Sequence, residues 1–242
     1  MGRLYVVGIG PGDRDHMTEE ALRILSEADR IIGYTTYLNL IRDLFPGRPM
    51  EGTGMRQEKE RCALALKYAS EGENVAVVSS GDAGIYGMAG LCLEMAEAFP
   101  DVEVTVIPGI SAALSGAALL GAPLDHDFVV LSLSDLLTPR EIIEKRLRYA
   151  AEGDFAICLY NPGSLHRPDG LRRACDLLLE ILPADRLCGI VRCIARPGQE
   201  SRILTLGDLR GVKPDMLMTV WIGSSRTRVV RNRLVTPRGY TL

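Results

Sequence analysis

The chain has 242 residues, of which 47% are hydrophobic and 24% are charged, the balance of a globular protein with ample material for a core. No apolar run reaches the ~18 residues that a membrane span requires, and the N-terminus lacks a secretory signal, so we expect a cytoplasmic protein without a membrane segment. A formal net charge of −3 argues against a nucleic-acid partner, and six scattered cysteines without a CxxC pair argue against a metal site.

In the first half, short apolar runs alternate with helical patterns, and most apolar runs end in glycine or another small residue. This alternation is typical of an α/β domain with a parallel sheet. In chain order we expect a strand at 4–7, a helix at 18–26, a strand at 29–33, a short helix ending near 45, a loop at 52–56, a helix at 57–70, a strand at 75–78, a helix from 85, a strand at 104–107 and a helix at 112–120.

The turn after the first strand, Gly8–Asp13, resembles a dinucleotide-binding loop but lacks its fingerprint. The third glycine position of GxGxxG holds Asp13, whose charge would repel a pyrophosphate, and Pro11 has no N–H for a phosphate. We therefore do not expect a Rossmann cofactor site. The glycines indicate unusual backbone angles or the close approach of a large ligand.

The stretch from Val75 to Gly87 reads as a buried strand, a small-residue turn and the start of a helix. Ligands of parallel sheets bind at the carboxyl ends of the strands, where this turn lies. Asp82 could accept from a ligand hydroxyl or ammonium group, or it could cap its own turn. Tyr86 could stack on a ligand or donate a hydrogen bond to it.

The second half continues the alternation. It predicts strands at 128–131, 155–160, 187–193, 201–205 and 216–222, with helices at 139–152 and 169–181. We thus predict an α/β fold of two α/β domains with mostly parallel sheets, residues 1–115 and 116–242. Six strands end in small or polar residues, which suggests one ligand site in the cleft between the two domains.

Three stretches resemble the tetrapyrrole methylases, S-adenosylmethionine (SAM)-dependent methyltransferases that modify uroporphyrinogen and corrin precursors. They are VGIGPGD at 7–13, SGDAGIY at 80–86 and PGISA at 108–112. Further stretches, SLSDLLTP at 132–139, LYNP at 159–162 and TPRGY at 236–240, are similar to the branch that methylates C17 of precorrin-3B or cobalt-factor III and contracts the ring. The resemblance covers essentially the whole chain. It implies the cobalamin pathway and a homodimer.

The resemblance also assigns site residues. SAM would be bound, largely through backbone atoms, by Gly81, Asp82, Ala83, Ile85, Tyr86, Ser111, Ala112, Tyr160, Asn161, Ile194, Ala195, Gly223 and Ser224. The tetrapyrrole substrate would meet Gly10, Pro11, Gly12, Arg140 and Arg238. The sequence departs from the family pattern at Ser111, Arg140 and Ser224, where Thr, Trp and Asn are usual.

Methyl transfer from a sulfonium needs alignment more than acid–base help, but ring contraction also needs proton transfers. The candidate acid–base groups are His126, Asp13, Asp135 and Tyr86, although a lone histidine such as His126 is often structural. His16 and His166 are expected to be exposed and inert.

Charge is divided unevenly between the two halves. Residues 1–112 carry 10 basic and 17 acidic side chains, a balance of −7, and residues 113–242 carry 18 basic and 14 acidic ones, a balance of +4. Sixteen of the latter 18 are arginine, the better partner for carboxylates. The excess would suit a substrate that carries acetate and propionate groups, or it is a solvated surface.

Four other functions remain open at this point. A sibling methylase could act at another ring position, and a ribosomal RNA 2′-O-methyltransferase shares the fold. A non-catalytic tetrapyrrole-binding or SAM-sensing module would lack turnover. A nucleotide-dependent oxidoreductase would bind NAD in place of S-adenosylhomocysteine.

Overall fold

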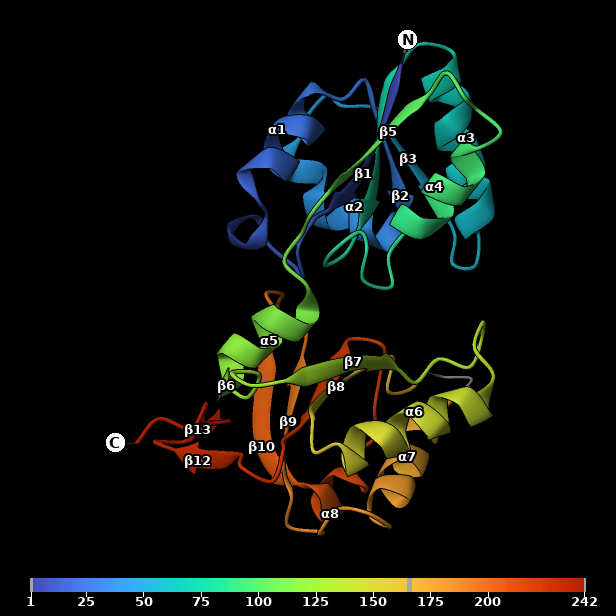
Figure 1. The fold of residues 1–242 in the computed structure, drawn as a ribbon. Helices are drawn as coiled ribbons and strands as arrows, with labels where there is room; N and C mark the ends of the chain where they lie inside the picture. Colours follow the sequence, from blue (N-terminus) through green and yellow to red (C-terminus); the bar gives the residue numbers. More distant parts are fainter. Residues whose placement is uncertain (1, 165–166, 242) are drawn as a thin grey trace. The chain divides into compact units, whose positions relative to one another are not determined.

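The computed structural model describes residues 2–164 and 167–241 and divides into two compact units, Met1–Ala112 and Ala113–Leu242 (Figure 1). The expected boundary after residue 115 falls inside α5 (Ala112–Leu120). From Ala113 onward this helix belongs to the second unit. Its Ala113 N–H and C=O groups bond Tyr160 and Trp221 of that unit's sheet.

The first unit has a five-stranded parallel sheet in the order β3-β2-β4-β1-β5. Its strands are β1 (Arg3–Gly8), β2 (Arg30–Tyr34), β3 (Met50–Thr53), β4 (Asn74–Ser79) and β5 (Glu103–Ile107). Its helices are α1 (Glu19–Glu27), α2 (Thr35–Ile41), α3 (Glu58–Ser70) and α4 (Ala89–Ala96), with 3₁₀ turns η1 (Arg14–His16) and η2 (Arg42–Leu44).

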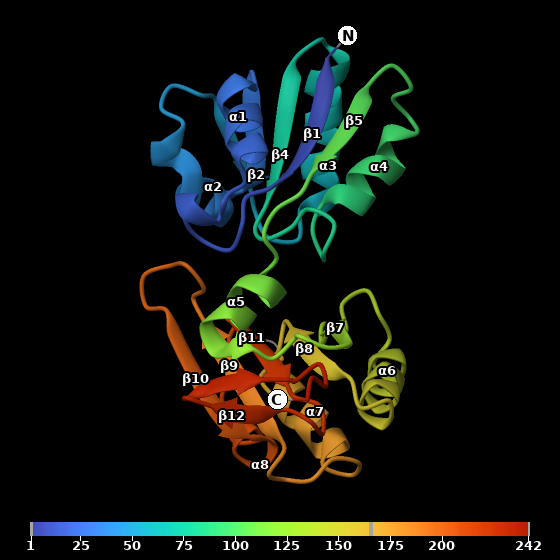
Figure 2. The same cartoon turned by 60° about the vertical axis from the view of Figure 1, so that its left-hand side comes forward.

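Helices cover both faces of this sheet, α1 and α2 on one and α3 and α4 on the other (Figure 2). The central strand β4 accounts for the two cores. Val75 and Val77 pack with α3 and α4, whereas Ala76 and Val78 pack with α1 and α2, and all four are buried. A strand buried on both faces reads as a continuous apolar run, which is why the sequence predicted it.

The second unit has a five-stranded sheet in the order β10-β9-β11-β8-β7 and a small sheet of β12, β13 and β6. Its strands are β6 (Gly121–Ala122), β7 (Phe128–Ser132), β8 (Ala156–Tyr160), β9 (Leu187–Arg192), β10 (Glu200–Thr205), β11 (Met218–Ile222), β12 (Arg228–Val230) and β13 (Arg233–Val235). Its remaining helices are α6 (Arg140–Glu152), α7 (Gly170–Leu178) and α8 (Leu206–Leu209).

The predicted α/β class is confirmed, and six of the ten strand pairs in the described residues are parallel. The larger sheet of the second unit departs from this rule. Only β7 and β8 pair in parallel there, because β11 lies between β8 and β9 in the opposite direction and β10 returns beside β9.

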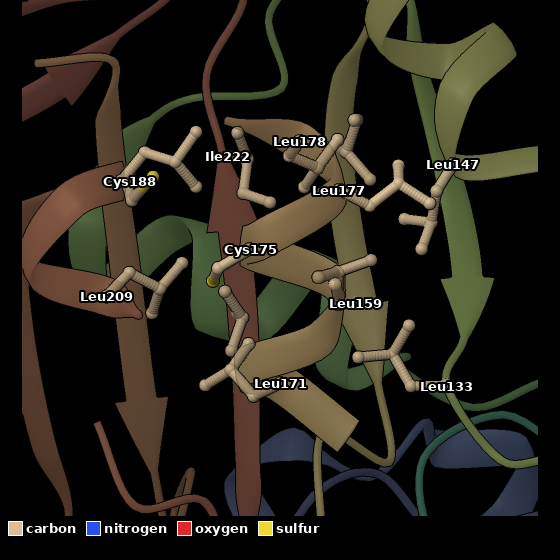
Figure 3. Packing of buried hydrophobic residues seen from close by; sticks show 14 of the residues in the cluster. Leu133, Leu147, Leu159, Leu171, Cys175, Leu177, Leu178, Cys188, Leu209 and Ile222 are labelled. Carbon is tan, nitrogen blue, oxygen red and sulfur yellow. The ribbon is translucent and has the colours of Figure 1, made fainter. Parts of the chain in front are cut away.

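One face of the second unit's larger sheet packs against α6, α7 and α8 in a leucine-rich core (Figure 3). Leu159 of β8 and Ile222 of β11 face this core together with Leu171 and Cys175 of α7. Trp221 lies on the other face, against Gly116 of α5. The two faces therefore alternate along β11, as the two-residue period of a strand requires.

Short elements account for most of the differences from the sequence prediction. The hairpin of β12 and β13 was not predicted, because its turn is Arg231-Asn232 with φ of 48° and 60° and contains no glycine. Helix α4 begins at Ala89 and not at Ile85, since the glycine turn extends further. All six cysteines are free and buried. No helix within the described residues has the length and apolar character of a membrane span.

Candidate functional site

Three glycine turns meet at one edge of the first sheet, because β1, β4 and β5 are parallel neighbours. Gly10 and Gly81 exchange two backbone hydrogen bonds, with N···O distances of 3.1 and 2.7 Å. Both have positive φ, 71° and 73°, which glycine adopts without strain. A Cβ atom on Gly109 would lie 2.2 Å from the Gly81 oxygen, so the third turn also requires glycine.

Asp82 ties these turns together with its carboxylate. Its Oδ1 accepts from the Gly84 N–H at 2.8 Å and its Oδ2 accepts from the Gly109 N–H at 2.9 Å. Of the two roles that the sequence left open, the side chain thus performs turn capping in this structure. Beyond it, Ile85 and Tyr86 are 39% and 56% exposed, and Tyr86 has a left-handed backbone with φ of 54°.

Predicted residues of the second unit gather at the carboxyl ends of β8 and β9, which run in the same direction because both are antiparallel to β11. The Tyr160 hydroxyl accepts from the Ala113 N–H at 2.8 Å, directly after Ser111 and Ala112 in the chain. Asn161 donates from Nδ2 to Ser132 Oγ at 2.9 Å. The turn after β9 is held by a 2.7 Å bond from the N–H of Ala195 to Gln199, while Ile194 is buried.

Gly223 and Ser224 do not gather with this group. They follow β11, and since β11 is antiparallel to β8 and β9, its carboxyl end lies at the opposite edge of the sheet. There the Gly223 N–H donates to the Leu187 oxygen at the start of β9, at 2.9 Å. Asp154 holds the following residue, accepting from the N–H and the hydroxyl of Ser225.

Asp135, a predicted acid–base group, lies in an arginine cluster after β7. Arg140 donates to its carboxylate at 2.9 Å, and the Arg167 Nε lies 3.7 Å away. The hydrogen bond from Arg140 is the main reason why the pKa of Asp135 is lower than its ordinary value. An anionic carboxylate held in this way orients the two guanidinium groups, and Arg167 also donates to the Leu133 oxygen at 3.0 Å.

Asp13 and His126, two of the three remaining acid–base candidates, make local contacts. Asp13 caps η1 and hydrogen-bonds the Nδ1 atom of His16, which is half-buried. His126 precedes β7, and Asp135 follows it, so the strand separates them along its length. The Nδ1 atom of His126 accepts from its neighbour Asp127 at 2.8 Å, which is a local structural bond. His166 lies outside the described residues.

The predicted substrate residues are divided between several segments. Pro11 is buried and Gly12 half-buried beside Gly10, at the glycine edge of the first sheet. Arg140 begins α6, and Arg238 is exposed in the segment after β13.

Residues with a strained, left-handed backbone also lie after the carboxyl ends of strands. Of the eight non-glycine residues with positive φ in the described chain, five follow the carboxyl ends of β3, β4, β8 and β9: Arg56, Tyr86, Asn161, Cys193 and Ala195. Such residues collect at functional sites. Three of them, Tyr86, Asn161 and Ala195, are site residues predicted from the sequence. Cys193 and Arg56 are not, because neither residue type signals a left-handed backbone.

Residues 3–210 match the family model described as Tetrapyrrole (Corrin/Porphyrin) Methylases. This chain belongs to that family. The tetrapyrrole methylase is 48% identical over 240 residues to the probable cobalt-factor III C(17)-methyltransferase of Salmonella typhimurium, covering 99% of this chain and 100% of that protein. It is 40% identical over 248 residues to the precorrin-3B C(17)-methyltransferase of Sinorhizobium sp, covering 99% and 97%.

Solved structures agree with the family. The crystal structure of the methyltransferase CobJ has a TM-score of 0.91 at 40% identity, covering 98% of this chain and 100% of that one. A uroporphyrin-III C-methyl transferase from Thermus thermophilus, complexed with S-adenyl homocysteine, has the same fold, with a TM-score of 0.74 at 22% identity and coverage of 92% and 97%.

Proposed function

We propose that this tetrapyrrole methylase transfers a methyl group from SAM to C17 of cobalt-factor III or precorrin-3B, with contraction of the ring, in cobalamin biosynthesis. The observation that carries the proposal is 48% identity to the Salmonella typhimurium protein over 99% of this chain and the whole of that protein. The glycine turns that carried the resemblance in the sequence lie together at one sheet edge, which supports a ligand there.

The residues at the strand ends fit SAM. In the first unit, the turn after β4 presents the exposed side chains of Ile85 and Tyr86 beside the backbone of Gly81, Asp82 and Ala83, and Ser111 and Ala112 follow β5. In the second unit, Tyr160, Asn161, Ile194 and Ala195 share one sheet edge. When bound, SAM supplies a methyl group already activated on a sulfonium. These small residues and backbone groups would orient it and exclude water.

The nucleophile is a ring carbon, so this chain need not provide one. Asp135 remains anionic between Arg140 and Arg167, and we assign it the positioning of these arginines toward substrate carboxylates. Asp13 and its partner His16 are the acid–base groups that we propose for the proton transfers of ring contraction. They follow the turn at Gly10–Gly12 that would meet the substrate.

The test is incubation of the purified protein with methyl-labelled SAM and either cobalt-factor III or precorrin-3B, followed by mass spectrometry and NMR of the product. The expected product carries one labelled methyl at C17 and a contracted ring. A label at another ring carbon would support the sibling methylase instead. No mass change with either substrate would overturn the proposal.

We also propose that the protein acts as a homodimer in the cytoplasm with a small tetrapyrrole substrate, as the family resemblance implies. Light scattering during size-exclusion chromatography tests the oligomeric state. A mass near 26.4 kDa at micromolar concentration, which is that of one chain, would exclude the dimer.

A further inference from the structure

The loop at 54–57 joins β3 to α3 at the edge of the first sheet that carries the glycine turns (Figure 1). β3 pairs in parallel with β2, and β2 with β4, so the ends of β3 and β4 point the same way. Two strand spacings of ~4.8 Å separate them, a distance that a long side chain or a macrocyclic ligand bridges. No sequence motif drew attention to this loop.

Arg61, in the first turns of α3, binds the backbone and a side chain next to this loop. Its side chain is 4% exposed, and it donates from Nε to Thr53 Oγ1 at 2.8 Å and from a terminal nitrogen to the Gly54 oxygen at 3.0 Å. A second terminal nitrogen reaches the Met88 sulfur at 3.5 Å, just before α4. Within the described residues, all its hydrogen-bond acceptors are neutral. A buried cation of this kind costs stability, so we infer that it serves to fix the loop relative to the turn after β4.

The loop itself holds Arg56 in a left-handed conformation with φ of 65°. The Gln57 side chain accepts from the Gly54 N–H at 2.6 Å, and this bond joins the two ends of the loop that contains Arg56. A left-handed backbone is unfavourable for a non-glycine residue, so the hydrogen bonds on either side of Arg56 maintain it. Arg56 is exposed, and the described part of the chain supplies no ion-pair partner for its guanidinium. Arg140 and Arg167, in contrast, already share the carboxylate of Asp135.

We propose that Arg56 binds a peripheral carboxylate of the tetrapyrrole substrate, and that Arg61 is the positioning residue that presents it. This inference rests on the proposed function, since it takes an acid-bearing macrocycle as the ligand. Arginine suits the task because its planar fork pairs with both carboxylate oxygens. The charge distribution gave no indication of a role for Arg56, because the first unit is acidic overall and the arginine excess lies in the second.

The test measures steady-state kinetics with cobalt-factor III, and calorimetric binding of S-adenosylhomocysteine, for the full-length protein and for Arg56→Gln. Loss of one charged contact should raise KM roughly 10- to 100-fold, while kcat and the Kd of S-adenosylhomocysteine stay within about twofold. Arg56→Lys should lie between the two. Arg42→Gln, an exposed arginine of η2, is the matched control and should leave KM unchanged.

Arg61→Lys tests the positioning role, because lysine keeps the charge but cannot make the three contacts. It should raise KM in the wild-type background and change it little in the Arg56→Gln background, as expected when one residue acts through the other. If Arg61→Lys does not fold, the Arg56 variants still decide the matter.

The outcomes separate the two levels of inference. A wild-type protein that forms no methylated product would refute the proposed function itself. A wild-type protein that forms product, together with an unchanged KM for Arg56→Gln, would overturn this inference alone. A weaker Kd for S-adenosylhomocysteine in place of a raised KM would also overturn it, since Arg56 would then bind the cofactor.

Discussion

The carboxylate of Asp154 is the centre of a small hydrogen-bond network in the second unit. It accepts from the N–H of Ser225 at 2.7 Å, from the hydroxyl of Ser225, and from Arg186 at 3.1 Å. Arg186 donates in turn to the Gly223 oxygen at 3.1 Å. Burial alone would raise the pKa of Asp154, but the bonds from Ser225 and Arg186 outweigh it, and the pKa is lower than its ordinary value.

A carboxyl whose pKa is depressed by folding stabilises the protein above its unfolded pKa of ~3.9, and this stability is lost as the pH falls through the lower folded value. We therefore expect Asp154→Asn to unfold more easily than wild type at pH 7. The difference should be about 1 kcal/mol, at the low end because the side chain is 42% exposed. Urea unfolding at pH 7 and pH 3 measures it, and the difference should shrink at pH 3.

Asp101→Asn is the control for this prediction, since Asp101 is exposed and has no ion pair within the described residues. It should match wild type at both values of pH. An Asp154→Asn variant as stable as wild type at pH 7 would mean that the network contributes nothing.

At the residue scale, the sequence predicts a structural role where the residue type itself favours one conformation, as glycine does in turns. The glycines of the turn after β1 predicted unusual backbone angles or a close ligand, and Gly10 has a φ of 71°. Asp82 was ambiguous because a turn cap and a ligand contact use the same oxygens. The role proposed for Arg56 could not be predicted from the sequence, since it depends on a backbone angle that only the folded loop fixes.

At the scale of single elements, the contact between α5 and β11 depends on one glycine. A Cβ atom on Gly116 would lie 2.2 Å from the ring of Trp221, which is 1% exposed and held by its bond to the Ala113 oxygen at 3.2 Å. We expect Gly116→Ala to lower the free energy of unfolding by roughly 1–3 kcal/mol, because the buried ring has no room to move. Urea unfolding measures this change.

Gly90 in α4 provides the opposite case with the same substitution. Nothing lies within 4 Å of a Cβ placed there. Because alanine favours a helix over glycine, Gly90→Ala should gain about 0.5–1 kcal/mol. Equal effects of the two substitutions would contradict the packing argument.

The direction of β11 also explains why Gly223 and Ser224 lie at the other edge of the sheet from Tyr160. A connection of seven residues, 193–199, joins β9 to β10, too short for the crossover that parallel strands require. That length alone could have predicted the antiparallel pair. The direction of β11 could not be predicted from a loop length, because it depends on the order of strands in the sheet. This direction places Gly223 at the opposite edge of the sheet from Tyr160.

At the scale of the whole molecule, the first unit has two hydrophobic cores and the second has one, and no described residue belongs to cores of both units. Cores of this kind form cooperative units that can unfold separately. The reactivity of the cysteines can measure the unfolding of each unit separately. Cys62 and Cys92 are buried in the first unit, and Cys158, Cys175, Cys188 and Cys193 in the second.

Buried thiols react slowly in the folded state, and burial raises the pKa of Cys175 to about 12, which also suppresses its reactive thiolate. We expect that pulsed alkylation with mass spectrometry across a urea series will modify the second-unit cysteines of Gly116→Ala at lower urea than those of wild type. Cys62 and Cys92 should react at unchanged urea in both proteins, because Gly116 touches only the second unit. Identical shifts at all six thiols would mean that the two units unfold as one.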